Sequence, residues 1–163
     1  MSEILGLGHD VVDVDAFAQQ WREPSSTMRK LFSVRELRQC TMRAALKHDD
    51  EALHAAARWA GKESVIKAWS EALADHAYPY SIESVPWHQI EILDDSRGRP
   101  RVMLAAPVAE RLIASQQPVE CEPVERRSAE YEAKERKSAE YVWHVSLSHD
   151  GGIASAVVLL CLE

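Results

Sequence analysis

The feature that most constrains the fold is a long helical pattern from Glu51 to His76, about seven turns at 3.6 residues per turn. Alanines recur throughout this stretch and favour helix. Gly61 interrupts the pattern at a cost of roughly 0.5 to 1 kcal/mol relative to alanine, so we expect another element to pack closely there. Large apolar residues fall on one stripe, as a core-facing helix requires; they are Trp59, Ile66, Trp69 and Leu73.

Short apolar segments on both sides of this helix predict strands. In the first of them, Gly6 and Gly8 permit another backbone to approach closely. The turn-rich run DDSRGRP at residues 94–100 predicts a hairpin between two of the others. The predicted strands are Ile4–Leu7, Gln89–Leu93, Arg101–Leu104, Val142–Leu147 and Ile153–Leu162.

Capping residues mark the starts of further helices. Asp13 and Asp15 are candidate N-caps before the first, and Ser33 with Glu36 has the spacing of a capping box. The predicted helices are Ala16–Arg22, Val34–Ala45 and Pro107–Gln116.

Length and composition indicate one ordinary globular domain. The chain has 163 residues, of which 46% are hydrophobic and 28% charged. No apolar run approaches the roughly 20 residues that span a bilayer, and the N-terminus lacks the pattern of a secretory signal, so we expect a cytoplasmic protein without a membrane partner. The net charge of −7 argues against general nucleic-acid binding.

The charge is distributed unevenly along the chain. Residues 21–47 contain seven basic and two acidic residues, a local net charge of +5. This stretch is either a solvated helix face or a docking patch for an acidic partner protein, where charge speeds encounter and selects orientation.

A charged insertion is predicted at residues 118–140 within the single domain 1–163. It contains a near repeat, RSAEY at 127–131 and KSAEY at 137–141, and almost no large aliphatic residues. We expect a surface helix or a mobile loop without a catalytic role.

Two carboxylates and a lysine form the strongest chemical pattern. Asp10 closes an apolar strand beside glycines, and Glu63 and Lys67 lie one turn apart on one helix face. Mg²⁺ takes one or two carboxylates together with waters and phosphate oxygens, so Asp10 and Glu63 could share a metal if the first strand lies beside the long helix. The alternatives are a turn aspartate and ordinary ion pairs on a helix surface.

Further candidates for ligand contact are weaker. Arg58 and Lys62 are also one helical turn apart, but Lys62 falls within the apolar stripe, where a charge needs a partner anion. His149 follows a predicted strand and precedes two glycines, which suits either a turn or a contact to a ligand phosphate or base.

Five motifs in order carry a family resemblance. They are GLGHDVVDV at 6–14, LFSVREL at 31–37, ARWAGKESVIKAW at 57–69, GRPRVML at 98–104 and HVSLSHDGGIASAVVL at 144–159. The chain resembles holo-[acyl-carrier-protein] synthases, the short type of 4'-phosphopantetheinyl transferase, and looks especially like actinobacterial members. The resemblance covers nearly the whole chain apart from the insertion.

The resemblance implies a Mg²⁺-dependent transfer of the 4'-phosphopantetheine arm of coenzyme A to a serine of apo acyl carrier protein, releasing 3',5'-ADP, in fatty acid biosynthesis. Asp10 and Glu63 would bind the metal, and Lys67 would neutralise the transferring phosphoryl group. The base that activates the serine is left open between a metal-bound water and either carboxylate. The remaining implied coenzyme A contacts are Arg58 and Lys62 at phosphates, His149 at the 3'-phosphoadenosine end, and Gly98 and Pro100 near the adenine.

The same resemblance implies an α+β fold with an antiparallel sheet packed on a long central helix, in a homotrimer with active sites at subunit boundaries. The expected partner is an acidic acyl carrier protein or a carrier domain of a fatty-acid synthase. It would dock on the basic stretch, where the expected contact residues are Arg22, Met28, Arg29, Phe32 and Trp59. Two other functions compete with the transferase: a non-catalytic module that binds coenzyme A or a carrier, and a Mg²⁺-dependent pyrophosphate hydrolase.

Overall fold

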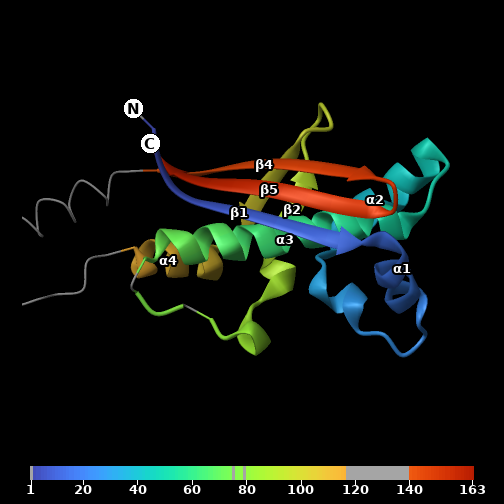
Figure 1. The fold of residues 1–163 in the computed structure, drawn as a ribbon, viewed down its shortest axis with the longest axis horizontal. Coiled ribbons are helices and arrows are strands. Elements are labelled where there is room, and N and C mark those ends of the chain that lie inside the picture. Colours follow the sequence, from blue (N-terminus) through green and yellow to red (C-terminus); the bar gives the residue numbers. More distant parts are fainter. Residues whose placement is uncertain (1, 75, 79, 117–139) are drawn as a thin grey trace, which may run out of the picture.

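A computed structural model describes residues 2–74, 76–78, 80–116 and 140–163. Three antiparallel strands lie side by side over the long helix α3 (Glu51–Ala72), in the order β1-β5-β4 (Figure 1). A separate antiparallel hairpin packs beside them, and its strands are β2 and β3. The α+β fold with an antiparallel sheet on a long helix, predicted from the sequence, is confirmed. The strands are β1 (Glu3–Asp13), β2 (Ile90–Asp94), β3 (Pro100–Leu104), β4 (Tyr141–Asp150) and β5 (Ile153–Leu162).

Helix α3 begins at the predicted residue and ends earlier than predicted. Asp50 caps its start by accepting a hydrogen bond from the backbone N–H of Ala52. The helix stops at Ala72 rather than His76, because Ala74 adopts a left-handed conformation with φ 49°. Its buried residues surround the helix instead of forming one stripe, since the sheet covers one side and α2 and the hairpin cover others. The helix is therefore the centre of the core.

Two of the remaining helices, those that follow Asp13 and Ser33, begin at predicted caps. Asp13 accepts a hydrogen bond from the N–H of Ala16, so Asp13 rather than Asp15 is the first cap. Ser33 and Glu36 form the predicted capping box. The helices are α1 (Val14–Arg22), α2 (Val34–Lys47) and α4 (Ala106–Ser115), and short 3₁₀ turns occur at η1 (Met28–Leu31), η2 (Ile82–Ser84) and η3 (Trp87–Gln89).

Two buried apolar clusters lie on either side of the middle of α3. The first joins α3 to β5 and the hairpin through residues such as Trp69, Ile92 and Leu160. The second joins α1, the segment before α2 and the start of α3, with Trp21 and Phe32 at its centre. The aromatic rings of Trp21 and Phe32 meet edge to face with centroids 5.3 Å apart.

Strand β1 lies directly on the backbone of α3. A Cβ built on Gly8 would lie 1.9 Å from the carbonyl oxygen of Ser64, and one on Gly6 would lie 2.1 Å from that of Ala68. The close approach predicted for these glycines is confirmed. Gly61 is also in a tight position, where an added Cβ would lie 3.0 Å from a side-chain carbon of Ile92.

The charged insertion predicted at residues 118–140 lies outside the described residues except for Glu140. The backbone of Glu140 pairs with that of Glu163 at the end of the sheet. The single domain with an insertion stays a prediction. Among the helices of the described ranges, none is long and apolar enough to cross a membrane.

We predict that Gly8→Ala strongly destabilises the protein, because its Cβ would collide with backbone atoms that cannot move without breaking α3. The expected loss is about 3 kcal/mol or more of the free energy of unfolding, or failure to fold. Gly61→Ala is the matched control. Its neighbours are side chains that can shift and alanine favours helix, so we expect a change within about 1 kcal/mol. Urea unfolding measures both, and equal effects in the two variants would contradict the prediction.

Candidate active site

Strand β1 brings Asp10 to the face of α3 that carries Glu63 and Lys67. The ammonium of Lys67 donates hydrogen bonds to the Oδ1 of Asp10 at 2.8 Å and to the backbone oxygen of His9 at 3.0 Å. This contact follows from the glycines at positions 6 and 8, which let the strand lie close enough for the carboxylate of Asp10 to reach the helix. The structure thus brings together the three residues predicted for catalysis.

The carboxylates of Asp10 and Glu63 have oxygen atoms that could bind a cation. The Oδ2 of Asp10 is buried and has no hydrogen-bond partner among the described residues. Burial raises the pKa of Glu63 to about 7, and the neighbouring Asp10 carboxylate adds to that rise, while Lys67 opposes it. Two carboxylates that destabilise each other's charge are a suitable place for a divalent cation.

Two carboxylates suit Mg²⁺, which also takes ligands from water and substrate, better than a metal ion whose ligands all come from the protein. Within the part of the chain that the structure describes, no group of three or more His, Cys, Asp or Glu side chains converges on one point. Mg²⁺ commonly binds through one or two carboxylates plus waters and substrate phosphates. Asp10 and Glu63 would hold it, and the half-exposed ammonium of Lys67 lies beside them, open to an anionic ligand.

The structure contradicts the expectation that Lys62 contacts a ligand phosphate. Its side chain is fully buried. The ammonium donates hydrogen bonds to the Oε2 of Glu36 at 2.8 Å and to two backbone oxygens, those of Trp87 at 2.7 Å and Ile90 at 2.5 Å. Burial lowers the pKa of Lys62, and the Glu36 carboxylate opposes this shift. The anion that this charge needs is supplied by the chain itself.

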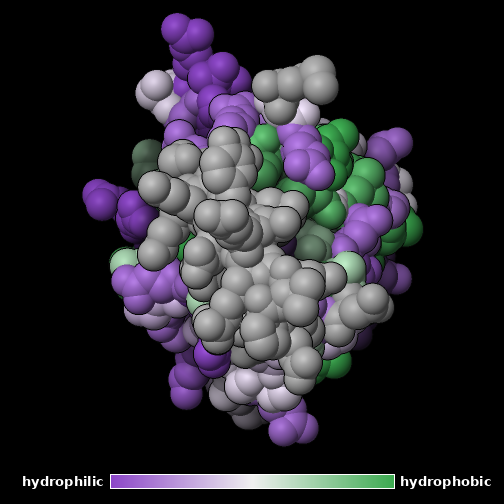
Figure 2. Space-filling model, turned by 90° about the vertical axis from the view of Figure 1, so that its left-hand side faces the viewer, coloured by the Kyte–Doolittle hydropathy of each residue, from purple (hydrophilic) through white to green (hydrophobic). Residues whose placement is uncertain are grey.

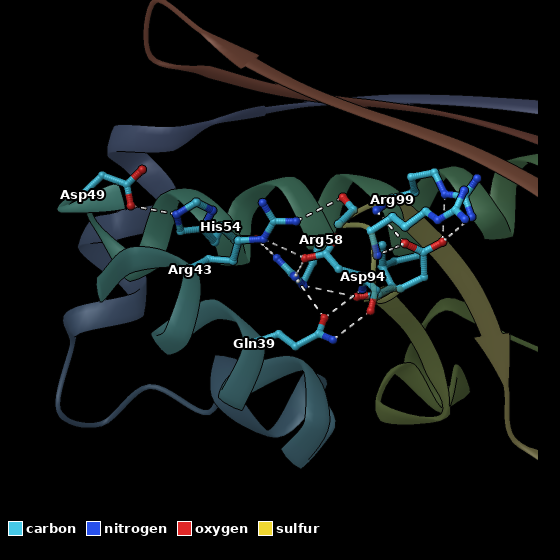
Figure 3. Close-up of polar contacts among 11 residues, drawn as sticks. Gln39, Arg43, Asp49, His54, Arg58, Asp94 and Arg99 are labelled. Atoms are coloured by element: carbon cyan, nitrogen blue, oxygen red, sulfur yellow. Dashed lines mark hydrogen bonds and ion pairs between the residues drawn. The ribbon is translucent and has the colours of Figure 1, made fainter. Parts of the chain in front are cut away.

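The expectation for Arg58 is also wrong, because the residue is 3% exposed and its guanidinium is bonded inside the protein. It donates to the Oδ2 of Asp94 at 2.8 Å and to the backbone oxygen of Ile92 at 3.1 Å. Figure 3 shows Arg43 and Gln39 converging on the same place from α2. Arg43 donates to Asp94 at 3.0 Å, and Gln39 bonds both backbone groups of Asp94. Arg58 therefore fastens the hairpin to α2 and α3.

This network holds the turn that contains Gly98 and leads into Pro100. Arg43 also donates to the backbone oxygen of Gly98 at 3.1 Å, and Gly98 has the positive φ of 75° that the turn requires. Pro100 begins β3 and is half-buried. The predicted hairpin is confirmed, and its tip is fixed by the protein's own arginine. A contact to adenine at this turn remains a proposal.

His149 lies near the end of β4, before the turn at Gly151 and Gly152, and is exposed. Its ring meets that of His54 edge to face, with centroids 6.3 Å apart. His54 is buried at the start of α3, and its Nε2 lies 2.7 Å from the Oδ1 of Asp49 (Figure 3). Sequence reasoning missed His54, because nothing local distinguishes it from other helix residues.

The expected partner-binding residues are mostly occupied within the chain. Arg22 pairs with Asp50, and Arg29 pairs with Glu51 at 3.1 Å and lies over the Trp21 ring. Phe32 is 4% exposed, so its expected contact with a partner is wrong: it belongs to the second core cluster. The half-buried residues are Met28, packed against that cluster, and Trp59, whose ring makes tilted contacts with those of Phe32 and Trp87.

Comparison with known proteins agrees with this arrangement. The family model described as the 4'-phosphopantetheinyl transferase superfamily matches residues 6–157. The chain belongs to this superfamily. The holo-[acyl-carrier-protein] synthase of Bifidobacterium animalis subsp. lactis is 52% identical over 161 residues, with 96% of this chain and 97% of the relative covered. That of Corynebacterium glutamicum is 33% identical over 160 residues, with coverages of 98% and 100%.

Solved structures give the same result. The structure named "Chronobacterium ammoniagenes ACPS-CoA complex" superimposes with a TM-score of 0.72 at 31% identity and covers 97% of each chain. The resemblance to holo-[acyl-carrier-protein] synthases stated from the sequence is confirmed, as is the likeness to actinobacterial members. In this phosphopantetheinyl transferase chain, the strand-and-helix motifs of the resemblance are the elements that bring Asp10 to Glu63.

We predict that Lys62→Met lowers the free energy of unfolding by about 3 to 5 kcal/mol, because it leaves the Glu36 carboxylate buried without its cation. The double variant Lys62→Met/Glu36→Gln should recover part of that loss, since neither position then carries a buried charge. Denaturant unfolding of the wild type, both single variants and the double variant gives the coupling energy. A Lys62→Met variant as stable as the wild type would contradict the buried pair.

Proposed function

We propose that this chain transfers the 4'-phosphopantetheine moiety of coenzyme A to a serine of apo acyl carrier protein, giving holo carrier protein and 3',5'-ADP. The observation that carries this proposal is the convergence of Asp10, Glu63 and Lys67 at the contact of β1 with α3. Relatives named holo-[acyl-carrier-protein] synthase, which match nearly the whole chain, support it.

The chemistry of the site suits phosphoryl transfer. The serine hydroxyl gives its proton to a base and its oxygen forms a bond to the phosphorus of the phosphopantetheine, while the bond from that phosphorus to the bridging oxygen breaks and 3',5'-ADP leaves. Mg²⁺ held by Asp10 and Glu63 would supply positive charge to the pyrophosphate oxygens. Lys67 can turn from Asp10 to the transferring phosphoryl group and stabilise the charge that builds up on it.

The pKa of Glu63 links metal binding to pH. With a pKa of about 7, part of the Glu63 population carries a proton at neutral pH, and metal binding requires that proton to leave. We therefore expect the metal to bind more tightly as the pH rises through 7.

We also propose that the chain works as a homotrimer, as its family resemblance implies. The face of the sheet that points away from α3 supports an assembly, because it exposes apolar side chains that a monomer would leave in water. Figure 2 shows hydrophobic surface gathered on one side of the end of the molecule that carries both termini. The exposed apolar residues of β1 and β5 are Ile4 (64%), Leu7 (51%), Val11 (50%), Ile153 (46%) and Val157 (40%).

We predict that incubation with coenzyme A, Mg²⁺ and an apo acyl carrier protein adds the mass of one phosphopantetheine arm to the carrier, and that EDTA prevents it. Asp10→Asn and Glu63→Gln should each lower the rate by about 10³-fold or more, because each removes one of the two anionic ligands. Intact-mass spectrometry of the carrier measures the transfer.

Asp15→Asn is the matched control, since Asp15 is an exposed carboxylate near the same strand and should leave the rate unchanged. Wild-type rates in both Asp10→Asn and Glu63→Gln would contradict the site. Coenzyme A binding without product would favour a binding module, and free phosphopantetheine without an acceptor would favour a pyrophosphate hydrolase.

We predict that Val157→Lys reduces the molar mass measured by light scattering from that of a trimer toward that of a monomer, because it places a charge on the outer face of the sheet. Ile113→Lys on α4 is the control, since Ile113 is 43% exposed and lies outside the sheet. A wild-type mass equal to one chain would rule out the assembly.

A further inference from the structure

His54 is a buried histidine that takes no part in the proposed phosphoryl transfer. It is 5% exposed and lies at the start of α3. Its Nε2 lies 2.7 Å from the Oδ1 of Asp49 (Figure 3). Because a carboxylate only accepts hydrogen bonds, this nitrogen carries the proton of the neutral ring. The bond to Asp49 therefore fixes both the tautomer and the orientation of the His54 ring.

The junction between α2 and α3 holds Asp49 in place. His48 ends α2 in a left-handed conformation with φ 56°, and the N–H of Asp49 donates to the backbone oxygen of Ala44 at 3.1 Å. The next residue, Asp50, caps α3. The carboxylate that orients His54 thus belongs to a backbone segment that is fixed at both ends.

The ring of His54 also contacts the ring of His149, near the end of β4. The two rings meet edge to face with centroids 6.3 Å apart. His149 is opposite the buried Ala154, so it lies on the face of the sheet that covers α3, whereas the next residue, Asp150, points to the other face. His149 is exposed, and within the part of the chain that the structure describes its ring nitrogens have no hydrogen-bond partner. Its ring is held by an ordered neighbour while both nitrogens stay open to a ligand.

The charges around the two rings favour an anion as that ligand. Burial lowers the pKa of His54, and the Asp49 carboxylate opposes this shift. The nearby cations of Lys47 and Arg58 lower the pKa further, so His54 is neutral at pH 7 and places no positive charge against His149. Arg58 is bonded inside the protein, whereas Lys47 is exposed and forms no ion pair within the described ranges.

We propose that His54 is a positioning residue for His149, whose ring it holds in the orientation that binds the 3'-phosphate of coenzyme A. The inference rests on the proposed function, which supplies this ligand. Coenzyme A carries one phosphate monoester, the group that remains in 3',5'-ADP. A phosphate monoester has close to two negative charges at neutral pH and three acceptor oxygens, so it suits an imidazole beside a free ammonium. An imidazole that is already oriented loses less side-chain entropy when it binds.

This role differs from a purely structural one in what it does to ligand preference. A histidine that only joined α2 to α3 would affect the stability of the fold and leave the preference between ligands unchanged. A histidine that orients His149 contributes to the preference for coenzyme A over 3'-dephospho-coenzyme A, because those two ligands differ only in the phosphate monoester.

The test is calorimetric titration of the wild type and variants with coenzyme A and with 3'-dephospho-coenzyme A. We expect His54→Ala to bind coenzyme A about tenfold more weakly and 3'-dephospho-coenzyme A as the wild type does. His54→Phe should recover most of the loss, since its ring can keep the contact with His149. The control is His76→Ala, because His76 is exposed and follows the other end of α3. It should match the wild type with both ligands.

A double-variant cycle shows whether His54 acts through His149. His149→Ala should weaken coenzyme A binding about tenfold, and His54→Ala/His149→Ala should weaken it no further. Histidine NMR of the wild type needs no variant: the ring signals of His54 and His149 should both shift when coenzyme A is added. With 3'-dephospho-coenzyme A both signals should stay where they are.

Equal weakening of both ligands by His54→Ala would overturn the inference, as would losses in the two single variants that multiply to about a hundredfold in the double variant. A His54→Phe variant as weak as His54→Ala, or a wild type that binds both ligands equally, would overturn it too. If the wild type binds coenzyme A but transfers nothing to a carrier, the proposed function fails by itself. The binding comparison then still decides the role of His54.

Discussion

The buried ion pair between Lys62 and Glu36 is the interaction on which the arrangement around α3 depends. Lys62 ties the middle of the central helix to the start of α2 and, through two backbone oxygens, to the segment that leads into the hairpin. Glu36 also accepts hydrogen bonds from the N–H groups of Ser33 and Ile92, so one carboxylate caps α2 and holds β2. A charge of either sign alone at this depth would cost several kcal/mol. The pair therefore specifies which elements meet.

A second group of charged residues, centred on Asp94, also holds separate elements together. Asp94 gathers Arg58 from α3 and Arg43 from α2, and this fixes the hairpin with respect to both helices. Arg58 and Arg43 thus hold the structure together, whereas the half-exposed Lys67 remains where an anionic partner can reach it.

The sequence was sufficient for features that depend on neighbouring residues. The capping box at Ser33, the glycines that bring β1 against α3 and the common face of Glu63 and Lys67 are all local patterns, and the structure has them. The family resemblance named the right family. The internal ion pairs of Lys62 and Arg58 could not be predicted in this way. Their partners, Glu36 and Asp94, lie 26 and 36 residues away and come close only through the packing of the fold. A lysine within an apolar stripe signals that an anion is needed, but it does not say whether a ligand or the chain supplies it.

The contact of Gly6 and Gly8 with α3 also has a consequence for motion. Backbone atoms that touch directly have no side chains between them to change rotamer, so β1 and α3 can move only as one body. The distance between Asp10 and Glu63 is then set in advance, and binding a substrate does not need to assemble the pair.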